Sequence, residues 1–329
     1  MIIFVEGSLQ LEIREICFRL RRLLEESVRR NPAEGILLSG GLDTSIIAQV
    51  ASVYQRLKGV TVAFREAFAP DVAYAKLIAD KLEIEHKVHY LSWEELLSEF
   101  PVAIRVLNSF DPMEIRNSVV ILVALRVAKD EGLKTVFTGD GADELFAGYS
   151  FLFKHSGEEL QRELAKMWEN MHFSSVDIAT HLGLDVKLPY LDEEFQNFAK
   201  QIEPSLKVRR INGVVYGKWI LRKAFEEILP PSIVWRAKTP IEQGAGTSCL
   251  TKIFDRLIGD EEFEEKKRNY QEVDGVEVRD KEHLFYYEIF RREVGVPSPK
   301  NPEEKTCPKC HSNVKSGSTY CRTCGAYPI

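Results

Sequence analysis

The sequence predicts an α/β fold: a parallel sheet with helices on both faces, followed by a mainly helical part and a small cysteine-rich unit. Four segments have the length of strands: 35–38, 59–64 and 135–138, which are mainly apolar, and 86–91, which mixes apolar and polar residues. Segments with helical apolar spacing separate them and lie at 46–53, 71–82, 93–106 and 118–130. Because strands that alternate with helices pair in parallel through crossover connections, this order predicts a sheet covered on both sides.

The rest of the chain divides by composition. A first helix over 9–30 ends at Asn31-Pro32, and the segment 259–282 is so rich in charge that we expect a mobile surface loop. Proline and polar residues make 296–306 a linker. The predicted units are a main domain at 1–295, whose helical part is about 151–295, the linker at 296–306 and a cysteine-rich unit at 307–329.

Composition excludes several classes of protein. The 329 residues are 44% hydrophobic, and the formal net charge of −6 argues against an unspecific nucleic-acid coat protein. The sequence has no apolar run of about 18 residues and no basic N-terminal region, so we expect neither a membrane span nor a signal peptide. We therefore expect a cytoplasmic protein, in which six cysteines favour metal binding over disulfides.

The first strand leads into Ser39-Gly40-Gly41-Leu42-Asp43-Thr44-Ser45, directly before a helix. Glycines let backbone N–H groups approach an anion at a helix start, and the hydroxyls of Thr44 and Ser45 add donors. The carboxylate of Asp43 would repel phosphate unless Mg²⁺ lies between them. The loop has no Walker lysine, and an ordinary Gly-Gly turn is the alternative.

A second acidic loop, residues 138–149, follows the fourth strand and begins Thr138-Gly139-Asp140-Gly141-Ala142-Asp143. Ligands of open α/β sheets bind outside the carboxyl ends of the strands, so we expect both loops to face one crevice. Asp43 and Asp143 are the candidate Mg²⁺ ligands, although Asp143 would also serve as a helix N-cap.

These motifs resemble a known family. The loop at 39–45 is similar to the pyrophosphate loop of the Rossmann-like ATP pyrophosphatase superfamily. Over roughly 9–295 the chain resembles the synthetase domain of asparagine synthetases and their β-lactam synthetase relatives. The blocks that carry the resemblance are 38–43, 139–149, 188–192, 218–225 and 234–238.

The resemblance implies an ATP-dependent ligase that forms an acyl-adenylate and pyrophosphate, and then passes the acyl group to a nitrogen nucleophile with release of AMP. Lys238 matches a lysine that contacts the phosphates, although an exposed surface lysine is the alternative. Leu37, Leu38 and the edge 62–64 would line the adenine pocket or simply belong to the core. The implied nucleotide-binding residues are Leu37, Leu38, Ser39, Gly40, Gly41, Asp43, Thr44, Ser45, Phe64, Gly139 and Asp143, and the implied catalytic residues are Asp43, Asp140, Asp143 and Lys238.

Three departures from the family concern its substrates. Asparagine synthetases place Glu, the residue taken to handle protons, where this chain has Asp140. Arg116 and Ser118 match a segment near the acyl substrate, but the residues before them are less typical. The chain has too few N-terminal residues for the family's glutaminase domain. We therefore expect free ammonia, another amine or a separate glutaminase subunit to supply nitrogen.

The C-terminal unit contains two Cys-x-x-Cys pairs, Cys307/Cys310 and Cys321/Cys324, which predict a structural tetrahedral Zn²⁺ site. A redox pair is the weaker interpretation. Lys309, Lys315 and Arg322 would let this zinc ribbon contact RNA, and a protein partner fits equally well.

Three functional hypotheses follow. The first is an AMP-forming ligase that converts aspartate to asparagine, the second is the same chemistry on another acceptor, RNA-linked acceptors included, and the third is a non-catalytic ATP-binding subunit. The sequence leaves open the oligomeric state, a homo-oligomer included.

Overall fold

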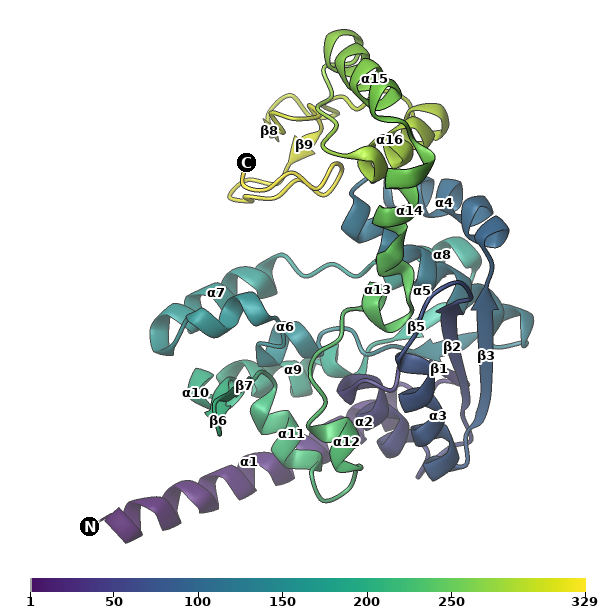
Figure 1. Cartoon of the computed structure of the whole chain (residues 1–329). Helices are drawn as coiled ribbons and strands as arrows, with labels where there is room; N and C mark the ends of the chain where they lie inside the picture. The colour runs from purple at the N-terminus through teal and green to yellow at the C-terminus, as the bar shows by residue number, and fades with distance from the viewer. Residues whose placement is uncertain (1) are drawn as a thin grey trace.

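The centre of the molecule is a five-stranded parallel sheet with strand order β3-β2-β1-β4-β5 (Figure 1). The computed structural model describes the backbone of residues 2–329 and the side chains of residues 10–329. In the register, Leu37 of β1 lies opposite Val60 of β2, and Ile36 lies opposite Phe137 of β4. The strands are β1 (Gly35–Leu37), β2 (Lys58–Phe64), β3 (Glu85–Leu91), β4 (Thr135–Phe137) and β5 (Asp185–Lys187).

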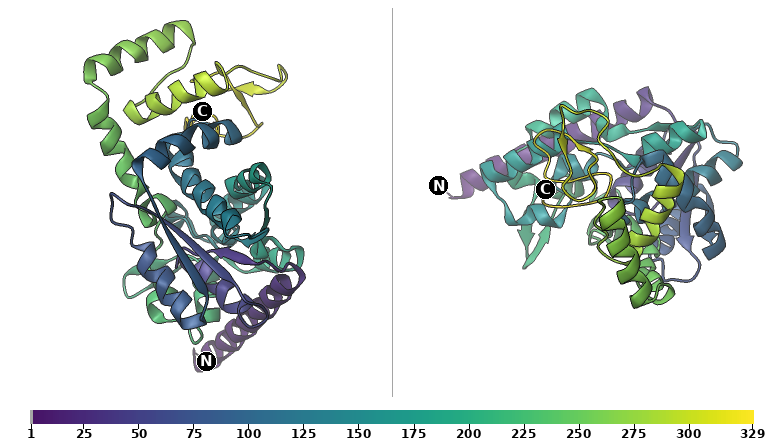
Figure 2. Two further views of the ribbon diagram at one scale, coloured as in Figure 1. Left: turned by 90° about the vertical axis from the view of Figure 1, so that its right-hand side faces the viewer. Right: turned by 90° about the horizontal axis from the view of Figure 1, so that it is seen from above.

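Helices cover both faces of this sheet, as Figures 1 and 2 show. One face packs on α1 (Ile2–Arg30), α2 (Leu42–Ala51) and α3 (Asp71–Leu82), whose apolar side chains form one core with Ile36 and Phe137. The other face packs on α4 (Trp93–Leu107), α5 (Pro112–Asp130) and α8 (Ser174–Leu182), which form a second core with Val60 and Val62. The predicted sheet with helices on both faces is therefore confirmed.

The order of the strands creates the crevice that a ligand needs. From β1 the chain runs outward through β2 to β3, whereas β4 pairs with the other edge of β1. The connections therefore diverge at the carboxyl ends of β1 and β4, the topological switch point where open α/β sheets bind ligands. Residues 39–45 and 138–149 both leave the sheet at this point.

The C-terminal half adds mostly helices, as expected. They are α6 (Ala142–Phe146), α7 (Gly157–Glu169), α9 (Glu193–Gln201), α10 (Pro204–Lys207), α11 (Trp219–Phe225), α12 (Pro231–Val234), α13 (Ile241–Gly244), α14 (Leu250–Leu257), α15 (Asp260–Val273) and α16 (Lys281–Glu293). This half also contains two antiparallel strand pairs. They are β6 (Arg209–Ile211) with β7 (Val214–Tyr216), between α10 and α11, and β8 (Lys305–Thr306) with β9 (Asn313–Val314), after α16.

The expected mobile loop at 259–282 is wrong for most of its length, because α15 occupies it. Ion pairs supply part of the stabilisation that the apolar residues do not. Lys266 pairs with Glu262 one turn away at 2.8 Å and with Glu288 of α16 at 2.9 Å. Phe263 is buried in the core that α15 shares with α16.

The cysteine-rich unit (residues 307–329, the ribbon below) packs against the main domain, contrary to the few contacts that a modular tail would make. Its four cysteines belong to the same apolar core as Phe110. Phe110 N donates to Thr323 O at 2.7 Å, and Glu277 N donates to Lys309 O at 2.8 Å. The division into domain and linker stays a prediction. Among residues 2–329, no helix has both the length and the apolar character that a membrane crossing requires.

Candidate active site

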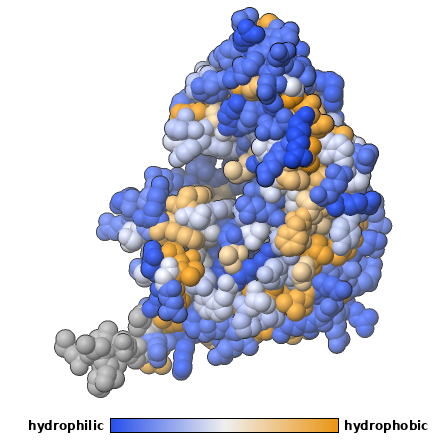
Figure 3. Space-filling model, in the orientation of Figure 1, coloured by the Kyte–Doolittle hydropathy of each residue, from blue (hydrophilic) through white to orange (hydrophobic). Residues whose placement is uncertain are grey.

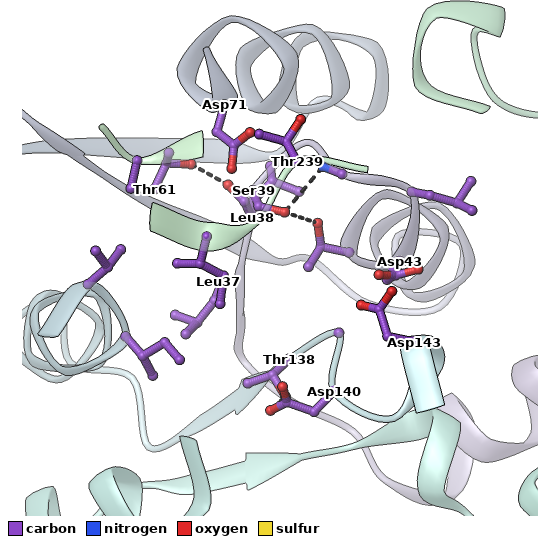
Figure 4. Close-up of a pocket in the computed structure, with 18 of the residues that line it drawn as sticks. Leu37, Leu38, Ser39, Asp43, Thr61, Asp71, Thr138, Asp140, Asp143 and Thr239 are labelled. Carbon is purple, nitrogen blue, oxygen red and sulfur yellow. Dashed lines mark hydrogen bonds between the residues drawn. The ribbon is translucent and has the colours of Figure 1, made fainter. Parts of the chain in front are cut away.

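A single pocket at the carboxyl ends of β1, β2 and β4 brings together most of the predicted site residues. Figure 3 shows this face of the molecule hollowed near its centre, and Figure 4 shows the pocket walls. The predicted residues that line it are Leu37, Leu38, Ser39, Gly41, Asp43, Thr44, Gly139, Asp140, Asp143 and Lys238.

The first loop forms a tight turn at the start of α2. Gly40 has a φ of +66°, and a Cβ there would collide with the backbone nitrogen of Ala75, so only glycine fits. Gly41 is the N-cap residue, and its N–H donates to Ser39 Oγ at 3.2 Å. Ser39 Oγ lies 3.1 Å from Thr44 Oγ1. Hydroxyls and helix N–H groups thus converge as an anion site requires.

Two carboxylates face each other across this turn, as Figure 4 shows for Asp43 and Asp143. Lys218 joins them. Its Nζ lies 2.6 Å from Asp43 Oδ2 and 2.7 Å from Asp143 Oδ1, and its side chain is only 4% exposed. Lys238 pairs with the other oxygen of Asp143 from a side chain that is 37% exposed. Two carboxylates and two ammonium groups therefore balance in charge.

The electrostatics of this cluster follow from burial and pairing. Burial by itself would raise the pKa of Asp143, but Lys218 and Lys238 outweigh it and hold that pKa below its usual range. Burial would lower the pKa of Lys238, but Asp143 and Asp43 raise it. Both groups are therefore ionised at neutral pH.

The cluster has the donor set for Mg²⁺. Asp43 Oδ1 is buried and accepts no hydrogen bond from the residues that the structure describes. A buried carboxylate oxygen without a partner is costly unless a ligand satisfies it. Mg²⁺ is usually bound by one or two carboxylates together with substrate phosphates, which fits Asp43 and Asp143.

Asp140 lies beside Thr138, apart from the Asp43–Asp143 pair (Figure 4). Its Oδ2 accepts hydrogen bonds from Thr138 Oγ1 at 2.8 Å and from Ser175 Oγ at 2.5 Å. Burial and the nearby Asp143 and Asp43 carboxylates raise the pKa of Asp140, and they outweigh these two hydrogen bonds. A carboxylate with a raised pKa is a suitable general base.

The apolar wall of the pocket comes from two elements. Leu37 and Leu38 lie at the end of β1, and Val120, Ile121 and Ala124 of α5 also line the pocket. Phe64 does not reach it. That side chain is buried in the core, and its backbone N–H donates to Ala245 O at 2.7 Å, so the segment around Ala245 covers the end of β2. Gly40 and Ser45 also lie outside the pocket lining.

The pocket is also lined by residues that were not predicted from the sequence, among them Lys218, Arg236 and Asp71. Lys218 lies in a quoted block, but nothing in its local sequence marks a buried cation. Arg236 lies in another block, and its guanidinium donates to Asp71 Oδ1 at 2.6 Å and stacks over the Tyr74 ring at 3.9 Å. Burial raises the pKa of Asp71 against the opposing effect of Arg236. Asp71 stands at the predicted start of α3, where an acidic residue also suits a helix.

The two residues expected near the acyl substrate, Arg116 and Ser118, do not line the pocket. Arg116 lies outside the pocket lining, where it pairs with the buried Glu282 at 2.8 Å and donates to Thr251 Oγ1 at 2.6 Å. Ser118 is buried and donates to Glu114 Oε1 at 3.2 Å. This arginine is therefore engaged within the protein.

The four cysteines of the ribbon form a compact second centre. Their sulfur atoms all lie within 4.8 Å of one another and are buried. The Cys307–Cys324 and Cys310–Cys321 Sγ distances are both 3.7 Å. A tetrahedral site with Zn–S bonds near 2.3 Å has an edge of about 3.8 Å, so the cluster has the size of a mononuclear metal site.

The chain is similar to several known proteins. The asparagine synthase family model matches residues 19–176 and 154–306. The probable glutamine-hydrolyzing asparagine synthetase of Schizosaccharomyces pombe is 33% identical and aligns with 83% of this chain and 56% of its own length. Asparagine synthetase B of Escherichia coli is 29% identical, with 85% and 54% covered. The NMN synthetase structure from Francisella tularensis is 15% identical, with a TM-score of 0.39, and covers 88% of this chain and 98% of its own.

The chain spans about half the length of the two asparagine synthetases. The family match covers the whole five-stranded sheet, both acidic loops and the segment that contains Lys218. The chain belongs to the asparagine synthase family.

Proposed function

We propose that this chain is an AMP-forming carbon–nitrogen ligase, with the conversion of aspartate to asparagine as its default reaction. The observation that carries the proposal is the pair of facing carboxylates, Asp43 and Asp143, with Lys238 beside them at the end of a phosphate-type loop. Family membership supports an ATP-dependent ligase.

In the first half-reaction a substrate carboxylate oxygen attacks the α-phosphorus of ATP. The new O–P bond forms as the bond to the β-phosphate oxygen breaks, and pyrophosphate leaves with that electron pair. The N–H groups at the start of α2 and the Lys238 ammonium would bind the phosphate oxygens, where negative charge develops. Mg²⁺ held by Asp43 and Asp143 would supply further charge compensation.

In the second half-reaction an amine attacks the acyl carbon and AMP leaves. The attacking nitrogen must lose a proton, and the carboxylate of Asp140, whose Oδ2 is held by two hydroxyls, would be the acceptor. Thr138 and Ser175 fix its orientation, and its raised pKa makes it a better proton acceptor than an ordinary aspartate. The apolar side chains of β1 and α5 would pack on adenine and exclude water.

A second candidate function keeps this chemistry and changes the carboxylate substrate. It is favoured by Arg116, which pairs with Glu282 and so does not present its charge to a substrate carboxylate. RNA-linked acceptors receive less support. Lys309 pairs with Glu277 at 2.5 Å, and Lys315 and Arg322 donate to backbone carbonyls, so the basic groups of the ribbon are engaged within the chain.

The remaining assignments complete the proposal. Cys307, Cys310, Cys321 and Cys324 would hold a structural Zn²⁺, because four thiolates close a tetrahedral shell. Nitrogen would come from ammonia, another amine or a separate glutaminase subunit in the cytoplasm.

The test is to identify the nucleotide products. With ATP, Mg²⁺, ammonia and single amino acids, we expect AMP and pyrophosphate, and aspartate-dependent exchange of labelled pyrophosphate into ATP. Lys238→Met should slow this exchange about 10²–10³-fold, the usual cost of losing one charge-stabilising donor. Lys252→Met, an exposed lysine on α14, is the control. ADP as the main product would contradict the proposal, and exchange with another carboxylate alone would select the second candidate.

A further inference from the structure

We propose that the ribbon positions two walls of the pocket, with Tyr320 and Arg322 acting as positioning residues. Tyr320 acts on the apolar wall formed by α5, and Arg322 acts on the start of α8, where Ser175 donates to Asp140. The inference rests on the proposed function for its meaning in catalysis. It adds a role for the C-terminal unit that neither the motifs nor the family match assigns.

Tyr320 holds the start of α5. Asp111 is the N-cap residue of this helix, and its Oδ1 accepts from Met113 N at 3.4 Å. Its other oxygen, Oδ2, accepts from the Tyr320 hydroxyl at 2.5 Å. Asp111 is 5% exposed, so this pair is shielded from water and resists screening. One carboxylate therefore caps the helix and fastens it to the ribbon.

Backbone and ring contacts reinforce this attachment. Ser109 Oγ donates to Arg322 O at 2.7 Å, next to the bond from Phe110 N to Thr323 O. The Phe110 ring stacks on His283 of α16 at 5.0 Å. Since α5 rises 1.5 Å per residue, Val120 follows Asp111 by about 14 Å along the same rigid helix. Movement of the N-terminus of α5 would therefore move a pocket wall.

Arg322 and Lys315 hold the connection between α7 and α8. The Arg322 guanidinium donates to Asn170 O at 2.8 Å, and Lys315 Nζ donates to Glu169 O at 3.0 Å. Helix α8 begins four residues after Asn170, and its second residue, Ser175, donates to Asp140 at 2.5 Å. The ribbon thus holds the segment that precedes Ser175, the residue that donates a hydrogen bond to Asp140.

A metal bound by the four cysteines would make this small unit rigid enough to hold α5 and the α7–α8 connection in place. The ribbon contains one short strand, β9, which pairs with β8 just before it, so we expect its fold to depend on the four cysteines. Metal binding supplies the folding free energy of such sites. Loss of the metal would release α5 and the α7–α8 connection together.

The experiment uses the full chain with its metal and compares the two half-reactions. In the double variant Tyr320→Phe/Arg322→Met, pyrophosphate exchange should fall less than acyl transfer, because α5 contributes only apolar side chains to the pocket. Acyl transfer to ammonia should fall about tenfold to a hundredfold, since small displacements of catalytic groups cost this much. The acid limb of the acyl-transfer pH profile should move to higher pH as Asp140 loses the Ser175 hydrogen bond. Lys305→Met, at an exposed position on β8 just before the ribbon, is the matched control.

Amide hydrogen exchange provides a readout that needs no substrate. In the double variant, and after chelation of the metal, amides of 112–116 and 170–176 should exchange faster, whereas β2 and β3 should not change. Faster exchange confined to 307–329, or an equal loss in both half-reactions, would overturn the inference. A chain without ligase activity would leave this exchange pattern intact, so failure of the proposed function is distinguishable.

Discussion

Lys218 donates a hydrogen bond to Asp43 Oδ2 at 2.6 Å, although 175 residues separate them in the chain. The lysine precedes α11 with a φ of 54°, in the left-handed region, and its backbone N–H donates to Phe146 O at 2.9 Å. The same ammonium lies 2.7 Å from Asp143 Oδ1. One buried cation therefore connects both acidic loops, and it offsets the repulsion that would drive the two carboxylates apart.

The first prediction is that Lys218→Met destabilises the fold. Without the ammonium, two largely buried carboxylates would share one remaining partner, Lys238. Breaking a buried ion pair from one side typically costs 3–5 kcal/mol, so we expect a loss of about 3 kcal/mol in the free energy of unfolding, measured by denaturant titration without added Mg²⁺. Added Mg²⁺ should restore part of this stability, because a divalent cation neutralises the same oxygens.

The matched control for this prediction is Lys166→Met. Lys166 pairs with Glu163 on the surface of α7 with a side chain that is 69% exposed, and such pairs contribute less than about 1 kcal/mol. Equal losses in the two variants would show that Lys218 is an ordinary surface-type cation.

The second prediction concerns the turn before α2. Gly40→Ala would place a methyl group against the backbone of Tyr74 and Ala75 in addition to forcing alanine into the left-handed region. Gly183→Ala, with a φ of +71° and open space around its Cβ, carries the conformational cost alone, about 1 kcal/mol. Thermal unfolding should show the larger loss for Gly40→Ala, together with weaker ATP binding. Similar losses would mean that α3 yields easily at this point.

The third prediction is a pH effect at Asp140. The Ser175 hydroxyl stabilises the carboxylate form, so Ser175→Ala should raise the pKa of Asp140 further. A general base must be deprotonated, and a higher pKa leaves less base at a given pH. The acid limb of the acyl-transfer rate should therefore move up by about one pH unit, the equivalent of one hydrogen bond to a charged group. If the acid limb of the pH profile does not move in Ser175→Ala, a group other than Asp140 titrates there.

Much of the fold could be predicted because most of its strands are mainly apolar and its helices repeat apolar residues at helical spacing. Strands β1 to β4 and helix α3 were predicted within one or two residues. Strand β5 was missed, since its three residues, Asp185–Lys187, include two charged ones and form no apolar run. Helix α15 was missed because most of its residues are charged, and its contacts with α16, such as the Lys266–Glu288 ion pair, are tertiary and leave no periodic signal.

The sequence predicted the site residues that lie in the loops after β1 and β4. It did not predict those that distant segments of the chain bring to the pocket. Asp43, Asp140 and Asp143 follow strands, so topology alone gathers them. Ser175 lies in α8 and Lys218 directly precedes α11, and no local pattern predicts where these helices pack. Phe64 was expected at the pocket because it ends β2, yet the segment around Ala245 covers it.

The last prediction concerns side-chain length at position 140. Asp140→Glu would install the residue that asparagine synthetases have there, but its carboxylate lies one methylene further from the backbone. Thr138 and Ser175 are placed for the shorter side chain, so the longer one should lose at least one of their hydrogen bonds. We expect acyl transfer to slow about tenfold and pyrophosphate exchange to stay unchanged, measured as separate half-reactions.

Asp140→Asn is the control for Asp140→Glu, because it keeps the size of the side chain and removes the base. It should slow acyl transfer by about 10²–10⁴-fold, the usual effect of losing a general base. A gain of asparagine synthesis in Asp140→Glu would contradict the fit between Asp140 and its two hydroxyl partners. If no variant forms asparagine while exchange with another carboxylate persists, the short side chain reflects a different acyl substrate, in agreement with the engaged Arg116.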